Sequence, residues 1–210
     1  MHYKVFSHRH GETILKDAVH QKLFGEVQAI LDSISEDELK AKHLSYPNTP
    51  MSLSKAINDV IKEKFIAAGW KDESAIFQDA EYQQERWRLD FAKEPISIEV
   101  AFNHGEAIAW NLLKPVLASE LNHVKKAIQT DAGIIITATA ELKEAGAFDG
   151  AVGEYEKVLR YLKPLGTILT APLVIIGLEP PDTFRLEKVQ KANGGHASRI
   201  VDISPGSAHG

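Results

Sequence analysis

The chain contains no cysteine, and this absence excludes disulfide frameworks, cysteine-ligated zinc sites and cysteine nucleophiles together. It also has no surplus of basic residues, because its formal net charge is -5 at pH 7. The protein therefore has no overall positive field for a polyanion such as nucleic acid. This lowers the expectation of a nucleic-acid-binding protein without excluding one, because a dimer can gather its positive charge in one cleft.

Long apolar runs are missing as well. The longest one, residues 171–178 (APLVIIGL), has the length of a buried strand, whereas a transmembrane helix needs roughly 20 apolar residues. The N-terminal segment, MHYKVFSHRH, contains no apolar signal-peptide core. We therefore expect a cytoplasmic protein that has no contact with a membrane.

The first third of the chain has the spacing of helices. Its 210 residues, 44% hydrophobic and 25% charged, fit one large domain or one domain with a small addition. Apolar residues recur at helical spacing over residues 12–34 and again from Ser52 or Ser54 to Gly69. The charged, proline-containing stretch between them breaks the pattern. Residues 1–70 are therefore predicted to be mainly helical.

Strand period appears in the middle of the chain. Apolar and other residues alternate over 87–92 and, after a turn at Glu94-Pro95, over 96–102. This pattern predicts a β-hairpin or two adjacent strands. An apolar stripe at helical spacing follows from about residue 106 to residue 128, with a kink or a late helix start expected at Pro115.

The last third alternates between strands and helices. Residues 133–138 and 171–178 are predicted to be buried strands, and residues 150–163 a helix. Strands interleaved with helices predict an α/β fold with a central mixed β-sheet flanked by helices. We expect a single domain over residues 1–210, with the catalytic core in 86–180 and a polar tail in 181–210.

The segment Arg9-His10-Gly11-Glu12 matches the RHGE signature of histidine phosphatases, whose histidine accepts a phosphoryl group. Such an enzyme needs this histidine at the carboxyl end of a buried strand, and the preceding residues make a poor one. The second histidine motif of these enzymes also follows a hydrophobic strand, whereas His196 follows a polar stretch. A histidine phosphatase therefore stays as the weaker alternative, beside a surface loop that caps the following helix.

Two carboxylates carry the stronger chemical signal. Asp90 and Glu99 fall on the two short strands predicted on either side of the Glu94-Pro95 turn. That geometry can bring both side chains to one edge of the sheet, where hard oxygen ligands suit Mg²⁺. Such an ion can lower the pKa of a bound water and neutralise charge on a phosphodiester. The spacing alone also fits ordinary polar residues of a half-exposed sheet.

Four segments, in one order and spanning most of the chain, carry a family resemblance. They are VFSHRHG (5–11), INDVIKEKFIAAGWKDE (57–73), DFAKEPISIEVAF (90–102) and APLVIIGLEP (171–180). Together they resemble the BglII/BstYI (BamHI-like) branch of the type II restriction endonucleases, within the PD-(D/E)XK nuclease superfamily. The RHGE match then belongs to the entry segment of that branch. The resemblance implies a restriction-endonuclease-like core.

The resemblance also implies roles for particular residues. Asp90 matches the metal-binding aspartate and Glu99 the second acidic ligand, while Val100 would offer its backbone carbonyl to the ion. Asn58 matches a polar residue that lines the same site, although a helix-surface amide is the other interpretation. Asn103 and His104 follow the active strand, in a connection that reaches DNA bases in the resembled enzymes; a plain strand-to-helix turn explains them equally well.

Position 101 departs from the resembled pattern. Superfamily members usually carry Lys there and this branch Gln or Glu, whereas this chain has Ala101, which cannot orient a water by hydrogen bonding. Three explanations are open. Another side chain takes the place of the missing one, the metal and the substrate phosphate alone activate the attacking water, or the enzyme is impaired. His104, Glu106 and Lys114 lie shortly downstream, and we favour Glu106 because a carboxylate keeps the acidic character of the branch.

The sequence thus predicts a Mg²⁺-dependent type II endonuclease that hydrolyses phosphodiesters of double-stranded DNA. We expect a homodimer that reads a palindromic site, with a GATC-centred target implied by the resemblance. A catalytically impaired, sequence-specific DNA-binding protein on the same fold is a further alternative, and Ala101 is its motive.

Overall fold

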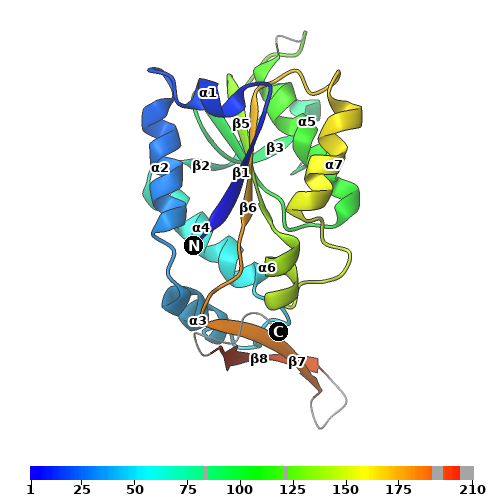
Figure 1. Cartoon of the computed structure of the whole chain (residues 1–210). Coiled ribbons are helices and arrows are strands. Elements are labelled where there is room, and N and C mark those ends of the chain that lie inside the picture. The colour runs from blue at the N-terminus through cyan, green and yellow to red at the C-terminus, as the bar shows by residue number, and fades with distance from the viewer. Residues whose placement is uncertain (83–84, 121–122, 191–195, 204–210) are drawn as a thin grey trace.

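A single mixed β-sheet runs through the computed structural model, which describes residues 1–82, 85–120, 123–190 and 196–203 (Figure 1). The six strands follow the order β1-β6-β5-β4-β3-β2. Neighbours β4, β5 and β6 are parallel, and the remaining neighbouring pairs are antiparallel. The strands are β1 (Tyr3–His8), β2 (Lys71–Ala75), β3 (Arg88–Lys93), β4 (Ile96–Val100), β5 (Ala132–Ala138) and β6 (Leu173–Leu178).

Helices cover both faces of this sheet. In Figure 1, α2 and α4 lie on one side of the strands and α5 and α7 on the other. The α-helices are α1 (Gly11–Leu15), α2 (Gln21–Asp32), α3 (Glu36–Leu44), α4 (Ser54–Ala67), α5 (Ile108–Ser119), α6 (Ala140–Ala145) and α7 (Tyr155–Leu165). Short 3-10 turns are η1 (Ala80–Tyr82), η2 (Glu85–Trp87) and η3 (Gly105–Ala107). The predicted α/β fold with a mixed sheet flanked by helices is confirmed.

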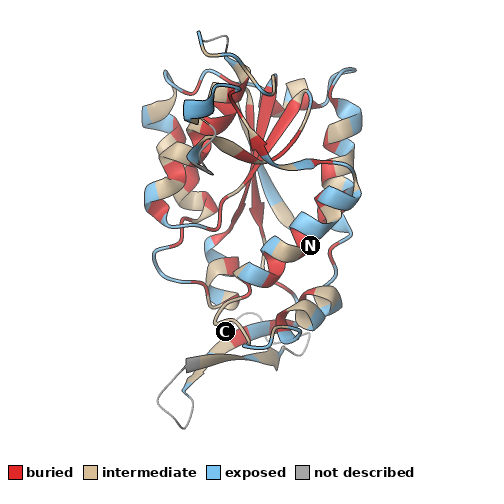
Figure 2. Ribbon diagram, turned by 180° about the vertical axis from the view of Figure 1, so that it is seen from behind, coloured by how far each residue is buried: buried red, intermediate tan, exposed pale blue. Residues whose placement is uncertain are grey.

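Alternation along the parallel strands supplies a core on each face. Ile134 and Ile136 of β5 pack with residues of α2 and α4, whereas Ile135 packs with residues of α5 and α7. Figure 2 shows these central strands as the buried part of the molecule, with exposed residues on the outer sides of the helices. Strands that are apolar on both faces are typical of a parallel sheet covered by helices.

The helical prediction for residues 12–34 is wrong in detail, because two helices occupy this stretch. The side chain of Asp17 accepts hydrogen bonds from the backbone N–H groups of Val19 and His20, each at 2.9 Å. Such local bonds compete with helical ones, so α1 ends and α2 starts afresh. The helix α3 was not predicted at all, although Ser35 caps it by accepting from the N–H of Glu38 at 3.1 Å.

The predicted helix from residue 106 to residue 128 is also shorter in the structure. Helix α5 ends at Ser119, and Glu120 has an extended ψ of 140°. Residues 121–122 of the predicted helix lie outside the described residues, and those from 123 to 128 are not helical. Pro115 remains inside α5 and is buried.

The predicted polar tail over 181–210 contains a folded hairpin, which corrects that expectation. Strands β7 (Phe184–Gln190) and β8 (His196–Asp202) pair antiparallel below the main sheet in Figure 1. The hairpin is joined to α3 through Lys40 Nζ and Asp202 Oδ1, at 2.9 Å. Residues 191–195 and 204–210 of the predicted tail lie outside the described residues. None of the helices in the described part of the chain is long and apolar enough to cross a bilayer.

Close contact between α5 and β5 depends on Gly133. A Cβ atom at this position would lie 2.5 Å from the Cβ of Pro115 and 2.9 Å from Cδ2 of Leu173. Pro115 cannot yield easily, because it is a rigid ring inside a buried helix turn. Glycine at 133 therefore fixes how closely α5 approaches the sheet.

We predict that Gly133→Ala lowers the free energy of unfolding by about 1–3 kcal/mol, as expected for overpacking of a dense interior. Gly25→Ala is the matched control, because a Cβ at this exposed position in α2 meets nothing within 4 Å. The control is expected to gain roughly 0.5–1 kcal/mol from helix propensity. Urea unfolding of the two variants measures both effects, and equal stabilisation by both would contradict the assigned contact.

Candidate active site

Asp90 lies at a position where strand pairing is interrupted on both sides of β3. The register of β2 and β3 joins Asp72 to Phe91 and Ser74 to Leu89, so it passes over Glu73 and Asp90. The last paired residues of β3 and β4 are Phe91 and Ile98, and Asp90 and Glu99 would come next. The regular pairing of β3 with both of its neighbours is therefore lost at Asp90.

Backbone N–H groups at this point bond to side-chain carboxylates instead of to carbonyls of the neighbouring strand. The N–H of Val100 donates to Oδ2 of Asp90 at 2.7 Å, and the N–H of Asp90 donates toward Oε1 of Glu99 at 3.4 Å. These two contacts hold the carboxylates of Asp90 and Glu99 next to each other on neighbouring strands. The sequence prediction that the hairpin brings this pair together agrees with the geometry.

Burial makes the two carboxylates hard to ionise. Glu99 is 1% exposed, and burial followed by repulsion from Asp90 raises its pKa well above the usual value, against the opposing effect of Lys114. The pKa of Asp90 is also raised, chiefly by burial, while Lys114 and the N–H of Val100 act in the opposite direction. Two adjacent buried carboxylates repel when ionised, and a cation between them relieves that repulsion.

Lys114 of α5 supplies positive charge to this pair from the face of the sheet opposite α4. It lies in α5, is 8% exposed, and its Nζ contacts Oε2 of Glu99. Glu106, which the sequence favoured as the substitute for the missing polar side chain at position 101, is instead exposed in the η3 turn before α5. Lys114 was the third-named candidate, and a signal for it existed: it is the single charged residue within α5.

A pocket of about 200 Å³ opens beside Asp90 and Val100. Asn58 and Lys62 of α4 line its opposite wall, so Asn58 does lie at the site that contains Asp90. Asp72 of β2 is also in the lining, and its Oδ2 is 3.0 Å from Nζ of Lys62. Glu99, which is buried, is not among the residues that line this pocket.

The oxygen donors at Asp90 and its neighbours fit a hard divalent cation. Asp90, Glu99 and the carbonyl of Val100 are oxygen donors, and Mg²⁺ prefers one or two carboxylates with water completing its shell. Among the described residues there is no group of three or more His, Asp or Glu side chains that could form an all-protein metal cage. The arrangement is therefore suited to an ion that keeps several waters.

The BglII/BglIII restriction endonuclease profile matches residues 3–178, which are most of the chain and include the whole sheet. The chain belongs to the BglII/BglIII restriction endonuclease family. Its members are DNA-cleaving hydrolases of restriction systems, so the chain is a type II restriction endonuclease. None of the curated proteins matches it in sequence.

Solved structures of BglII share the fold of this restriction endonuclease. The crystal structure of BglII complexed with a DNA 16-mer has 16% identity and a TM-score of 0.65, over 97% of this chain and 100% of that chain. The crystal structure of free BglII also has 16% identity, with a TM-score of 0.51 over 96% of this chain and 94% of that chain. The restriction-endonuclease fold predicted from the resemblance is thereby confirmed.

Asn103 and His104 leave the carboxyl end of β4 in the connection to α5. Both are exposed, although the Oδ1 of Asn103 accepts a hydrogen bond from Asn111 at 2.9 Å. The backbone of the same connection is tied to the segment before α7, where Gly105 N–H donates to Ala151 at 2.7 Å. This loop of the endonuclease thus presents two polar side chains on an anchored backbone.

The RHGE segment serves the structure of the endonuclease. The guanidinium of Arg9 donates to the carbonyls of Leu169 at 2.7 Å and Gly166 at 2.8 Å, which anchors the turn after β1. His10 is exposed with a left-handed φ of 58° and precedes α1. His196 begins β8, and Figure 1 shows α1 and β8 at opposite ends of the molecule. The two histidine segments of the phosphatase interpretation do not meet.

We predict that Asp90→Asn raises the free energy of unfolding at pH 8 without divalent ions, by roughly 0.5–2 kcal/mol. The raised pKa of Asp90 means that the folded state holds its proton more tightly than the unfolded state. The carboxyl therefore costs stability above its folded pKa, and this cost is absent below the unfolded value of about 4. The amide oxygen of Asn can still accept from Val100.

Urea unfolding at pH 8 and again near pH 4 measures this effect, and the gain should shrink at the lower pH. Asp79→Asn is the control, because Asp79 is exposed, and it should change stability by less than about 0.5 kcal/mol. A loss of stability in Asp90→Asn at pH 8 would show that the carboxylate is held favourably in the metal-free fold.

Proposed function

We propose that this restriction endonuclease cleaves duplex DNA in a Mg²⁺-dependent reaction, at a palindromic site read by a homodimer. The observation that carries the proposal is the pairing of the Asp90 and Glu99 carboxylates where β3 opens on both sides. A site with two-fold symmetry lets each subunit of a dimer cut one strand.

Asp90, Glu99 and the carbonyl of Val100 are the proposed ligands of Mg²⁺. A bound Mg²⁺ lowers the pKa of a coordinated water and stabilises charge on the phosphate. Asp90 presents its carboxylate to the pocket and is held there by the N–H of Val100. Asn58, which is exposed on the opposite wall, is placed to hydrogen-bond the DNA backbone or an ordered water at the site.

Asn103 and His104 are the proposed contacts with base edges. They lie in the connection that begins directly after β4, so they follow the catalytic strand into solvent. Asn and His both carry donors and acceptors, which the major groove pattern of a base pair requires. A GATC-centred site is the first target to test, on the strength of the family resemblance.

The apolar side of α5 is not available as the interface of the proposed homodimer. Ile108, Leu112 and Val116 of α5 are buried against the sheet and α7 within the subunit. That face is already covered, so it cannot also contact a second copy. The homodimer itself stays a proposal.

We expect incubation with phage DNA in Mg²⁺ to produce discrete fragments, and sequencing of their ends to show one palindromic site. The reaction without divalent ion should leave the DNA intact. Specific retention of duplex DNA with no cleavage in either Mg²⁺ or Mn²⁺ would instead establish an impaired DNA-binding protein. Turnover of phosphomonoesters without metal, lost in His10→Ala, would establish the phosphatase alternative.

For the site itself, we predict that Asp90→Ala and Glu99→Ala each slow cleavage by about 10³-fold or more, because the proposed cation loses a ligand. DNA binding in Ca²⁺ should stay within a few-fold of the unmodified protein. Glu144→Ala is the control, because Glu144 is exposed in α6 and lines a different pocket. Single-turnover cleavage decides the point, and a full rate in Glu99→Ala would remove Glu99 from the site.

A further inference from the structure

A small buried residue, Ala101, directly follows the end of β4, just beyond the carboxylate pair. Ala101 follows Glu99 by two positions, so both side chains point to the face of the sheet that α5 covers. Ala101 is 5% exposed and packs in the same cluster as Ile108 and Leu112 of α5. Its single methyl group leaves room for α5 to lie close to the strand, and a longer side chain would meet the helix.

The same close approach brings Lys114 to the carboxylates. Gly133 and Pro115 fix the distance between β5 and α5 one residue away from Lys114. The side chain of Lys114 is enclosed, and its Nζ contacts Oε2 of Glu99. Its charge also opposes the effect of burial on the pKa of Asp90, so it acts on both carboxylates.

We propose that Lys114 is a catalytic residue, whose ammonium group crosses from α5 to stabilise the phosphate during cleavage. This inference rests on the proposed nuclease function. Lysine has three N–H donors, and among the described residues Glu99 is the one acceptor that contacts Lys114. In the proposal, the remaining donors bind phosphate oxygens. Lys114 thus supplies from α5 the polar group that Ala101 lacks.

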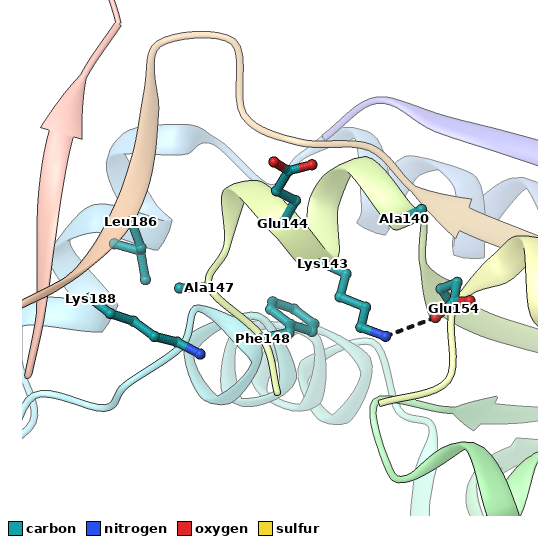
Figure 3. A pocket seen from close by; sticks show the side chains of 8 residues that line it. All are labelled: Ala140, Lys143, Glu144, Ala147, Phe148, Glu154, Leu186 and Lys188. Atoms are coloured by element: carbon teal, nitrogen blue, oxygen red, sulfur yellow. Dashed lines mark hydrogen bonds and ion pairs between the residues drawn. The ribbon is translucent and has the colours of Figure 1, made fainter. Parts of the chain in front are cut away.

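A purely structural ion pair looks different in this molecule. Lys143 of α6 donates to the carbonyls of Gly150 at 2.8 Å and Val152 at 2.7 Å, and to Glu154 Oε2 at 2.9 Å. Its three protons therefore match three acceptors, and Figure 3 shows the Lys143–Glu154 contact at a pocket that shares no residue with the candidate active site. Lys114, in contrast, lies against the paired carboxylates.

The proposed role leaves the atoms of the reaction balanced. Hydrolysis forms a bond from a water oxygen to phosphorus and breaks the bond from phosphorus to a sugar oxygen. The water gives up one proton and the departing oxygen gains one, both by exchange with solvent. Lys114 keeps its protons and lowers the energy of the extra negative charge on the phosphate in the transition state.

The first test compares Lys114→Met with Lys143→Met in single-turnover cleavage at saturating Mg²⁺. Methionine keeps the length of the side chain and removes its charge. We expect Lys114→Met to slow cleavage by about 10²–10³-fold, with duplex binding in Ca²⁺ within a few-fold of the unmodified protein. Lys143→Met should cleave at the normal rate per folded molecule. Normal cleavage by Lys114→Met would overturn the proposal.

The absence of native cysteine allows a sharper test, which also covers a methionine variant that fails to fold. Lys114→Cys carries the only thiol, so it can be alkylated in denaturant and refolded. 2-Bromoethylamine, which loses bromide to the thiolate, restores a lysine-like ammonium group, whereas iodoacetamide adds a neutral amide of similar size. We expect only the aminoethylated protein to recover cleavage by at least tenfold.

Equal activity of the two adducts, in refolded protein that binds duplex DNA in Ca²⁺, would overturn the role of Lys114. That outcome is distinct from failure of the proposed function, in which the unmodified protein itself does not cleave DNA in Mg²⁺ or Mn²⁺. If the protein cleaves DNA at a rate that does not depend on the charge at position 114, it is a nuclease in which Lys114 has no catalytic role.

Discussion

The buried carboxylate of Glu99, held between Asp90 and Lys114, is the interaction on which this part of the molecule depends. It explains why the β-ladder opens at Asp90, since the N–H groups there bond to carboxylates instead of carbonyls. It also gives a reason for the close approach of α5, which has to bring a positive charge within reach of Glu99. The interrupted pairing of β3, the position of α5 and the charge of Lys114 are therefore linked through Glu99.

Such an arrangement is unfavourable for stability taken alone. Ionised carboxylates in the interior lose their hydration, and a buried ion pair often recovers only part of that loss. Glu73, beside Asp90 on the next strand, adds a left-handed φ of 46°, a conformation that costs about 1–3 kcal/mol for a non-glycine residue. Two large apolar cores on either face of the sheet offset these costs. The packed cores on the two faces of the sheet thus keep the carboxylates in place.

The sequence predicted those features that follow from local patterns. Strand alternation located β3 and β4, and continuous apolar runs located β5 and β6. Helix α3 was within reach, because Ser35 and Glu38 have the spacing of a capping box, but its weak apolar pattern hid it. The hairpin partners Asp90 and Glu99 could be proposed from the sequence because they are neighbours in it. Its place as the one charged residue of an apolar helix pointed to Lys114, but the choice over Glu106 depended on the packing of α5 on the sheet, which decides which side chain turns inward.

The pocket beside Asp90 is acidic, as is the chain as a whole, whose formal net charge is -5. Asp59, Asp72, Glu73 and Asp90 all line the pocket, and its one lysine, Lys62, is paired with Asp72. A DNA phosphate approaching this surface meets like charge, which opposes binding unless a cation intervenes. A divalent ion on the carboxylates would reverse the local sign and attract the same phosphate. In the proposed function, the acidic surroundings of Asp90 would make phosphate binding conditional on the metal, and an acidic chain could then act on DNA.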